Sequence, residues 1–149
     1  IVVAANMLSS ELLRPGSITR EQIEAEIGPI DVGPDPSAPR VPGSTAQHYA
    51  PQTPVALLAS DLIDQRVDAM LQDHRRVAVL ARRPPRKAQQ GVTWINASRR
   101  ADLYAQGLYA ALRSLDKAGA DLILVEDVPD RPEWSAVRDR LARGAVNTP

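Results

Sequence analysis

The chain has 149 residues, enough for one domain or slightly more. Its 18 basic and 18 acidic side chains cancel, which excludes binding to nucleic acid or membrane by bulk charge but leaves a local patch open. The absence of Cys excludes a disulfide framework, a thiolate metal site and a Cys nucleophile. Because Phe is also absent, aliphatic side chains must build the core. No transmembrane run or signal peptide is evident, so we expect a soluble cytoplasmic protein without membrane partners.

The first region, residues 1–28, begins with Ile1 rather than Met, and we expect the chain to be an internal piece of a longer protein. Residues 1–4 and 8–13 are predicted strands, and Thr19 with Gln22 has the spacing of a capping box for a helix that stops at Gly28. Such strands would normally belong to a larger sheet. We therefore expect them to be disordered, to pair with another chain or to fold back on the remaining residues.

Residues 29–54 form a proline-rich segment that holds seven of the 13 prolines. Because Pro cannot continue a helix or a central strand, we predict an extended and fairly stiff linker. His48 and Tyr49 stand side by side near its end, where a spacer needs neither an imidazole nor a phenol. Tyr49 would either reach over a neighbouring site as a lid or pin the linker to one domain, and composition leaves both interpretations open.

From residue 55 onward, short apolar segments alternate with amphipathic ones. Continuous apolar strands between amphipathic helices are typical of a parallel sheet covered by helices. We therefore predict an α/β fold: a small doubly wound, mostly parallel and Rossmann-like sheet of four to five strands with helices on both faces. Ser60 and Ser98 are the predicted N-caps of its first two helices. The predicted strands are 55–59, 76–81, 92–97 and 122–125, and the predicted helices are 60–74, 98–118 and 133–145.

The common catalytic and nucleotide-binding motifs are missing from this region. No GxGxxG, GxxxxGK[ST] or GxSxG motif occurs, and His48 and His74 are far apart in sequence. Asp121, Glu126 and Asp127 bracket the last strand and could hold Mg²⁺, although loop and cap roles suit them better. We expect no metal site, and the region by itself does not resemble an enzyme.

A basic cluster flanks the second strand of this region and suggests either a phosphate or RNA contact or a solvated loop compensated by acidic helix faces. The second interpretation is favoured because no aromatic residue is interleaved for stacking on bases. Trp94 and Trp134 are expected to be core anchors, and Tyr104 and Tyr109 to pack with their hydroxyls in water. The cluster consists of Arg75, Arg76, Arg82, Arg83, Arg86 and Lys87.

Four segments carry motifs of one family, in the same order. Residues 13–19 read Leu-Arg-Pro-Gly-Ser-Ile-Thr, and residues 41–51 end in His-Tyr-Ala-Pro after Val-Pro-Gly. Residues 108–116 read Leu-Tyr-Ala-Ala-Leu-Arg-Ser-Leu-Asp, and residues 138–145 read Arg-Asp-Arg-Leu-Ala-Arg-Gly-Ala. Together they resemble the long, two-domain threonylcarbamoyl-AMP synthases, although Ser44 replaces the Met usual in that family's linker.

The resemblance implies three parts: residues 1–28 as the C-terminal remnant of a YrdC-type catalytic domain, 29–54 as interdomain linker and lid, and 55–149 as a C-terminal α/β domain. The family is a nucleotidyltransferase that makes threonylcarbamoyl-AMP and pyrophosphate from L-threonine, bicarbonate and ATP, for threonylcarbamoyladenosine modification of tRNA. ATP, with Mg²⁺, would bind in the catalytic domain, so this fragment alone is expected to be inactive. The implied partners are that domain and a tRNA or tRNA-modification protein.

Two matched positions are implied to contact ATP, and none is implied to be catalytic. Arg14 would offer a guanidinium fork to the phosphates. Tyr49 would close over the nucleotide and exclude water that hydrolyses the adenylate. The alternative is a non-catalytic doubly wound module that binds a small ligand, a partner protein or tRNA. The remaining lid and linker positions are Pro42, Gly43, His48 and Pro51, with His48 in an orienting or packing role.

Overall fold

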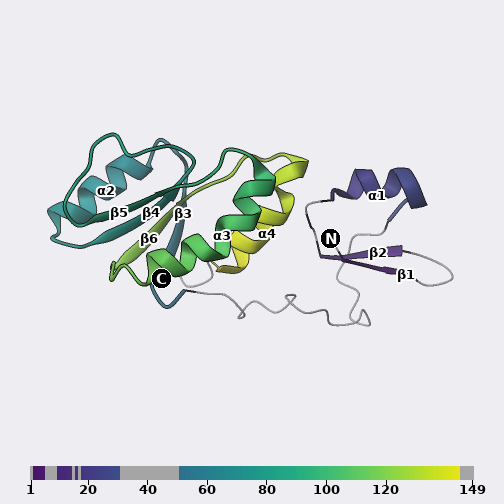
Figure 1. Cartoon of the computed structure of the whole chain (residues 1–149), viewed down its shortest axis with the longest axis horizontal. Coiled ribbons are helices and arrows are strands. Elements are labelled where there is room, and N and C mark those ends of the chain that lie inside the picture. The colour runs from purple at the N-terminus through teal and green to yellow at the C-terminus, as the bar shows by residue number, and fades with distance from the viewer. Residues whose placement is uncertain (1, 6–9, 15, 17, 31–50, 145–149) are drawn as a thin grey trace.

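The computed structural model describes residues 2–5, 10–14, 16, 18–30 and 51–144 (Figure 1). Two parts of the chain are thus described, one on each side of residues 31–50, and each is treated by itself below. No helix in the described ranges combines the length and apolar character needed to cross a membrane.

The amino-terminal part contains two short strands that pair with each other. β1 (Val2–Ala5) and β2 (Ser10–Arg14) run antiparallel, with Val3 opposite Leu12. The prediction of two strands is confirmed, with bounds shifted by one to two residues at every end. Their pairing with each other was not among the outcomes expected from sequence. That expectation treated both as edge strands that would pair outside residues 1–28.

Helix α1 (Arg20–Ile27) begins and ends where local signals predict. The Thr19 hydroxyl accepts the N–H of Gln22 at 3.3 Å, and the Gln22 side chain accepts the N–H of Thr19 at 2.8 Å. This capping box satisfies two of the amide groups that a helix start leaves unpaired. Gly28 ends the helix with φ of 87°, a left-handed conformation that favours glycine.

The carboxyl-terminal part is built on four parallel strands. The strand order is β3-β6-β4-β5, so the last strand of the chain lies between the first two strands of this sheet. Every neighbouring pair is parallel, with Val77 opposite both Leu122 and Val92. The predicted fold class is confirmed. The strands are β3 (Val55–Leu58), β4 (Val77–Ala81), β5 (Val92–Asn96) and β6 (Leu122–Glu126).

Helices cover both faces of this sheet (Figure 1). α2 (Ile63–Gln72) packs on one face. α3 (Ala101–Asp116) and α4 (Ser135–Gly144) pack on the other, with the 3-10 turn η1 (Pro132–Trp134) before α4. Each helix turns its apolar stripe toward the strands, so the domain has two aliphatic core layers separated by the sheet.

The central strands β4 and β6 explain why the sequence is apolar without alternation in these segments. All five residues of each strand are buried. Along β4, Val77 and Val79 point to the α2 face while Ala78 and Leu80 point to the α3 face. Because each face is covered, these positions need apolar side chains except at Glu126, whose carboxylate pairs with Arg82 at the end of β6. Each fully buried Val or Leu stabilises the fold by about 1.5–3 kcal/mol.

The predicted serine caps were wrong. Ser60 lies in a turn, and α2 begins at Ile63 with Leu62 as its N-cap and no side-chain capping bond. The Ser98 hydroxyl accepts the N–H of Arg100 at 3.1 Å and so stabilises the turn before α3. Each serine lies two residues after the end of a strand, and the chain needs further residues to turn from the sheet edge onto a helix axis.

Trp134 is a core anchor, as predicted, with 4% of its surface exposed. Tyr104 meets it edge to face at 5.4 Å and is equally buried, so the prediction of a hydroxyl in water was wrong for this residue. Tyr104 belongs to the stripe of α3 that faces the sheet. Its hydroxyl has no hydrogen-bond partner among the described residues, and burial raises its pKa far above the ordinary value.

Replacing Tyr104 by Phe removes this unpaired hydroxyl and keeps the ring contact with Trp134. We expect the free energy of unfolding to stay constant or to rise by up to about 1 kcal/mol, because no bond is lost and a desolvation cost disappears. Urea unfolding of both chains measures the difference. Tyr104→Ala is the control and should lose about 3 kcal/mol. A clear loss for Tyr104→Phe would show that the hydroxyl is bonded in solution.

Candidate functional site

Of the two positions implied to contact ATP, Tyr49 lies outside the described residues, within 31–50. The predicted lid and linker positions Pro42, Gly43 and His48 lie outside them as well. The backbone of Arg14 is described: it ends β2 and lies opposite Val2. Pro51 is described and buried. The structure therefore describes how the end of the proline-rich segment joins the α/β part of the chain.

Asp116, the last residue of α3, holds the end of the linker. Its Oδ1 accepts the N–H of Thr53 at 2.8 Å, and its Oδ2 accepts the N–H of Gln52 at 3.2 Å. One residue later the chain enters the sheet, where the carbonyl of Pro54 accepts the N–H of Ile123 at 2.8 Å. Sequence reasoning missed Asp116, although it closes a segment that matched a family motif.

The electrostatics of Asp116 agree with this role. Burial by itself would raise the pKa of the carboxyl, since it disfavours the charged form. The hydrogen bonds donated by Thr53 and Gln52 act in the opposite direction and together outweigh burial, so the pKa lies below its ordinary value. The carboxylate is therefore ionised when the linker end is bound.

At the opposite end of the strands lies the switch point, where doubly wound sheets usually bind ligands. The chain leaves β6 toward η1 and α4 on one face, while it leaves both neighbouring strands toward the α2 face. Here the carboxylate of Glu126, which is 5% exposed, accepts the backbone N–H of Arg82 at 2.5 Å. It also accepts a hydrogen bond from Nη2 of the Arg82 guanidinium at 3.1 Å. The same Nη2 donates to the carbonyl of Asp127 at 3.1 Å. The ion pair of Glu126 and Arg82 thus lies at this edge of the sheet.

The possible Mg²⁺ ligands are not brought together. Asp121 lies at the amino end of β6, and its carboxylate accepts the N–H of Arg76 at 2.7 Å. Glu126 and Asp127 lie at the other end of the same strand. Within the described ranges, no group of three or more His, Asp or Glu side chains could hold a metal ion. The favoured interpretation, loop and cap roles for these acids, is confirmed for Asp121.

Acidic side chains compensate part of the basic cluster, and the predicted partner on a helix is found for Arg83 and Arg86. Arg83 and Arg86 both pair with Asp64 of α2, at 2.9 and 2.8 Å. Arg82 pairs with Glu126, and Arg76 donates to the carbonyl of Ala118 at 3.0 Å. These bonds give the arginines local structural roles. Binding of tRNA by this stretch stays a prediction.

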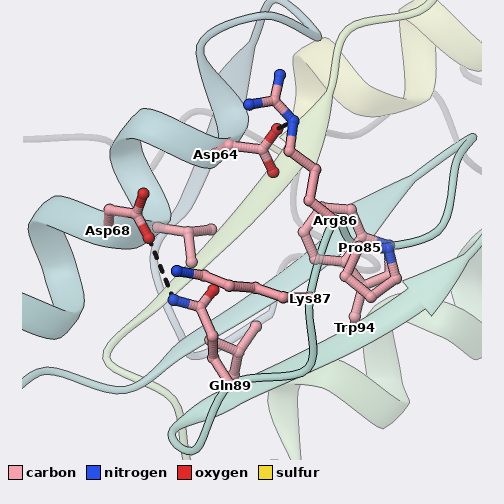
Figure 2. A pocket seen from close by; sticks show the side chains of 9 residues that line it. Asp64, Asp68, Pro85, Arg86, Lys87, Gln89 and Trp94 are labelled. Carbon is pink, nitrogen blue, oxygen red and sulfur yellow. Dashed lines mark hydrogen bonds and ion pairs between the residues drawn. The ribbon is translucent and has the colours of Figure 1, made fainter.

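Beside the cluster lies a shallow pocket of about 270 Å³ between α2 and the loop that joins β4 to β5 (Figure 2). Trp94 forms part of the pocket wall and is only half buried. It packs against the hydrophobic cluster on the α2 face of the sheet, so it is a core anchor only in part. Its indole N–H donates to the carbonyl of Arg83 at 2.9 Å. The pocket is lined by Asp64, Val67, Asp68, Pro85, Arg86, Lys87, Gln89, Val92 and Trp94.

The charges of this pocket largely satisfy one another. Asp64 binds Arg86, and Asp68 accepts from Gln89 at 3.2 Å. Figure 2 shows Lys87 extending toward Asp68 and Gln89. With acidic groups from the helix facing basic groups from the loop, the pocket has no excess charge of either sign. It is therefore a weaker candidate site than the contact between Asp116 and the linker.

These features define a small doubly wound α/β domain. The Arg82–Glu126 ion pair lies at the carboxyl ends of its strands, and Asp116 binds the end of the proline-rich segment at their amino ends. The family model described as "Threonylcarbamoyl-AMP synthase, C-terminal domain" matches residues 18–146, and the chain belongs to this family. The family predicted from sequence is thereby confirmed.

Individual relatives agree with this assignment. The chain is 39% identical over 144 residues to the threonylcarbamoyl-AMP synthase of Bacillus subtilis (strain 168), covering 90% of this chain and 41% of that protein. The crystal structure of Pyrococcus abyssi Sua5 complexed with L-threonine matches with a TM-score of 0.73 and 26% identity, over 97% of this chain and 44% of that one. The C-terminal Sua5 domain from Pyrococcus horikoshii matches with a TM-score of 0.50 and 25% identity, over 62% of this chain and 93% of that one. The chain thus spans less than half of its longer relatives.

Glu126→Ala tests the ion pair at the carboxyl edge. The substitution leaves the largely buried guanidinium of Arg82 without its carboxylate, and we expect a loss of about 2–4 kcal/mol in the free energy of unfolding. Glu133→Ala removes the same charge from an exposed site and should stay within about 0.5 kcal/mol of the wild type. Equal effects of the two substitutions in denaturant titrations would contradict the structural role of the pair.

The lowered pKa of Asp116 predicts a pH-dependent contribution. A carboxyl with a depressed folded-state pKa stabilises the fold above its unfolded value of about 3.9, and this stabilisation is lost as pH falls through the folded value. Asn does not titrate, so the stability gap between wild type and Asp116→Asn should be constant above about pH 5 and narrow below about pH 4. Unfolding titrations from neutral to acidic pH measure this gap. A gap independent of pH would show that the charge contributes nothing.

Proposed function

We propose that this chain is the C-terminal accessory domain and active-site linker of an L-threonylcarbamoyladenylate synthase. The whole protein would convert L-threonine, bicarbonate and ATP into threonylcarbamoyl-AMP and pyrophosphate, for threonylcarbamoyladenosine modification of tRNA. The observation that carries this proposal is the family match over residues 18–146. Because the chain spans 41% of the Bacillus subtilis synthase, the reaction is proposed for the whole protein and not for this part of it.

The proposed division places a catalytic-domain remnant at residues 1–28, the linker and lid at 29–54 and the α/β domain at 55–149. Support for the last boundary comes from packing: the hydrophobic clusters on both faces of the sheet draw all their described members from Val55 onward. The Pyrococcus horikoshii domain matches 62% of this chain, a length that agrees with an α/β unit able to stand alone.

In the proposed reaction, an oxygen of the threonine-derived carbamate forms a bond to the α-phosphorus of ATP, and the bond from that phosphorus to the pyrophosphate oxygen breaks. Pyrophosphate leaves with the electron pair. Arg14 would bind ATP phosphates through its planar guanidinium, and Tyr49 would cover the nucleotide and keep water from the adenylate product. Mg²⁺ is proposed to accompany ATP in the catalytic domain, as the family resemblance implies.

The test uses the full-length protein and follows pyrophosphate release that depends on threonine and bicarbonate. Tyr49→Ala should lower kcat/KM for ATP by about 10-fold or more, since it removes the ring that covers the nucleotide. Tyr49→Phe keeps the ring and should retain most of the activity. The 149-residue chain alone should release no pyrophosphate.

The possible failures are distinct. Unchanged turnover of Tyr49→Ala would overturn the lid role while leaving the activity in place. A wild-type protein without threonine-dependent pyrophosphate release would overturn the proposed activity itself.

A further inference from the structure

The pocket of about 270 Å³ beside the basic cluster exists because one helix cannot cover a whole face of this sheet. Four strands spaced about 4.8 Å apart span about 14 Å, whereas an α-helix with its side chains is about 10 Å wide. Among the described helices, α2 alone packs on this face, where it forms a cluster with β4 and β6. The edge strand β5 is left to the loop 82–91, and Val92 and Trp94 stay only partly buried beside it.

The apolar wall of this pocket is held in place by contacts within the chain. It includes Val67 from α2 and Val92 and Trp94 from β5. The indole N–H of Trp94 donates to the carbonyl of Arg83 at 2.9 Å, and the guanidinium of Arg83 lies 5.3 Å from the centre of the indole ring. Both contacts fix the ring, and the indole needs no hydrogen-bond acceptor from a ligand. This wall therefore offers apolar surface.

Two acids on the helix side of the pocket have bonding capacity left. Asp64 and Asp68 are four residues apart, so they lie one turn apart on the same face of α2. Oδ2 of Asp64 pairs with Arg83 and Arg86, and Oδ1 of Asp68 accepts from Gln89. The second oxygen of each carboxylate accepts no hydrogen bond within the described part of the chain. The helix side can therefore bind a cation.

Two bases on the loop side have unused donors. Arg86 pairs with Asp64 through its Nε, and its two Nη atoms donate to none of the described residues. Lys87 extends toward Asp68 and Gln89 in Figure 2, yet it makes no ion pair or hydrogen bond within the described ranges. The loop side can therefore bind an anion.

A ligand with charge of one sign would be repelled by one of these two sides. An anion beside the loop faces the carboxylates of α2, and a cation beside α2 faces the two bases. A ligand that carries both charges pairs with both sides at once. The volume of about 270 Å³ lies just below the usual range of about 300–1,000 Å³ for ligand pockets, so such a ligand must be small.

We propose that this pocket binds a small zwitterion, namely a free α-amino acid with an apolar side chain. Its carboxylate binds Arg86 and Lys87, and its ammonium group binds the second oxygen of Asp68. Its side chain packs on Trp94 and Val92. The proposal goes beyond the proposed synthase function and does not depend on it, because every group that it uses lies within residues 64–94.

The test titrates the 149-residue chain with L-leucine while NMR follows the indole N–H signals of its two tryptophans. The signal of Trp94 should shift and saturate with a Kd on the order of 1 mM, as expected for a few exposed charge pairs and one apolar contact. The signal of Trp134, which is buried on the other face of the sheet, should stay constant.

Three analogues of L-leucine each lack one of the groups that the pocket recognises. Isocaproate lacks the ammonium group, isoamylamine lacks the carboxylate, and glycine lacks the apolar side chain. Each should bind about 5- to 10-fold more weakly than L-leucine, because each loses one of the three contacts.

Variants that remove one charge assign the contacts. Lys87→Gln should weaken L-leucine and isocaproate by about 5-fold without weakening isoamylamine, since only the first two carry a carboxylate. Asp68→Asn should weaken L-leucine and isoamylamine by about 5-fold without weakening isocaproate. Both side chains are exposed, so neither substitution should unfold the chain. Lys117→Gln and Asp73→Asn remove the same charges at exposed positions outside the pocket and should change no affinity.

The proposal is overturned if the Trp94 signal shows no saturable shift at L-leucine concentrations about 20-fold above the expected Kd. It is also overturned if any of the three analogues binds as tightly as L-leucine, since the pocket would then ignore the group that this analogue lacks. Equal affinities of Lys87→Gln, Asp68→Asn and the two control variants would contradict the assigned contacts.

Discussion

The burial of strands β4 and β6 is the constraint on which the rest of the described α/β domain depends. With no Phe in the chain and all five residues of both strands buried, aliphatic side chains must fill a core layer on each face of the sheet. This requirement brings α2 to one face and α3 with α4 to the other. Because β6 inserts between β3 and β4, residues far apart in sequence meet at both ends of the strands.

The two ends of the strands serve different purposes. At the carboxyl end, Glu126 and Arg82 pair across neighbouring strands, at the position where many doubly wound sheets bind a ligand. At the amino end, Asp116 binds the peptide that enters from the linker. The domain thus uses its polar groups to pair neighbouring strands at one edge and to attach a neighbouring segment at the other.

Sequence predictions succeeded where the deciding interactions are local or periodic. Thr19 and Gln22 bond within one helical turn, so their spacing is sufficient to predict the cap. The parallel sheet followed from unbroken apolar segments. The prediction failed for Ser60, because the turn before the helix is longer than the pattern implies. It also failed for the hydroxyl of Tyr104, which is buried in the core without a hydrogen-bond partner among the described residues.

The sequence by itself determined the fold class, the ends of α1 and the family, because periodic burial, capping geometry and consecutive motifs are all written in adjacent residues. Only the tertiary structure decided the strand order, the pairing of Arg82 with Glu126 and the contact of Asp116 with Gln52 and Thr53. The two side-chain contacts join positions 44 to 64 residues apart. No local pattern predicts such contacts, since they arise from how β6 and α3 pack into the sheet.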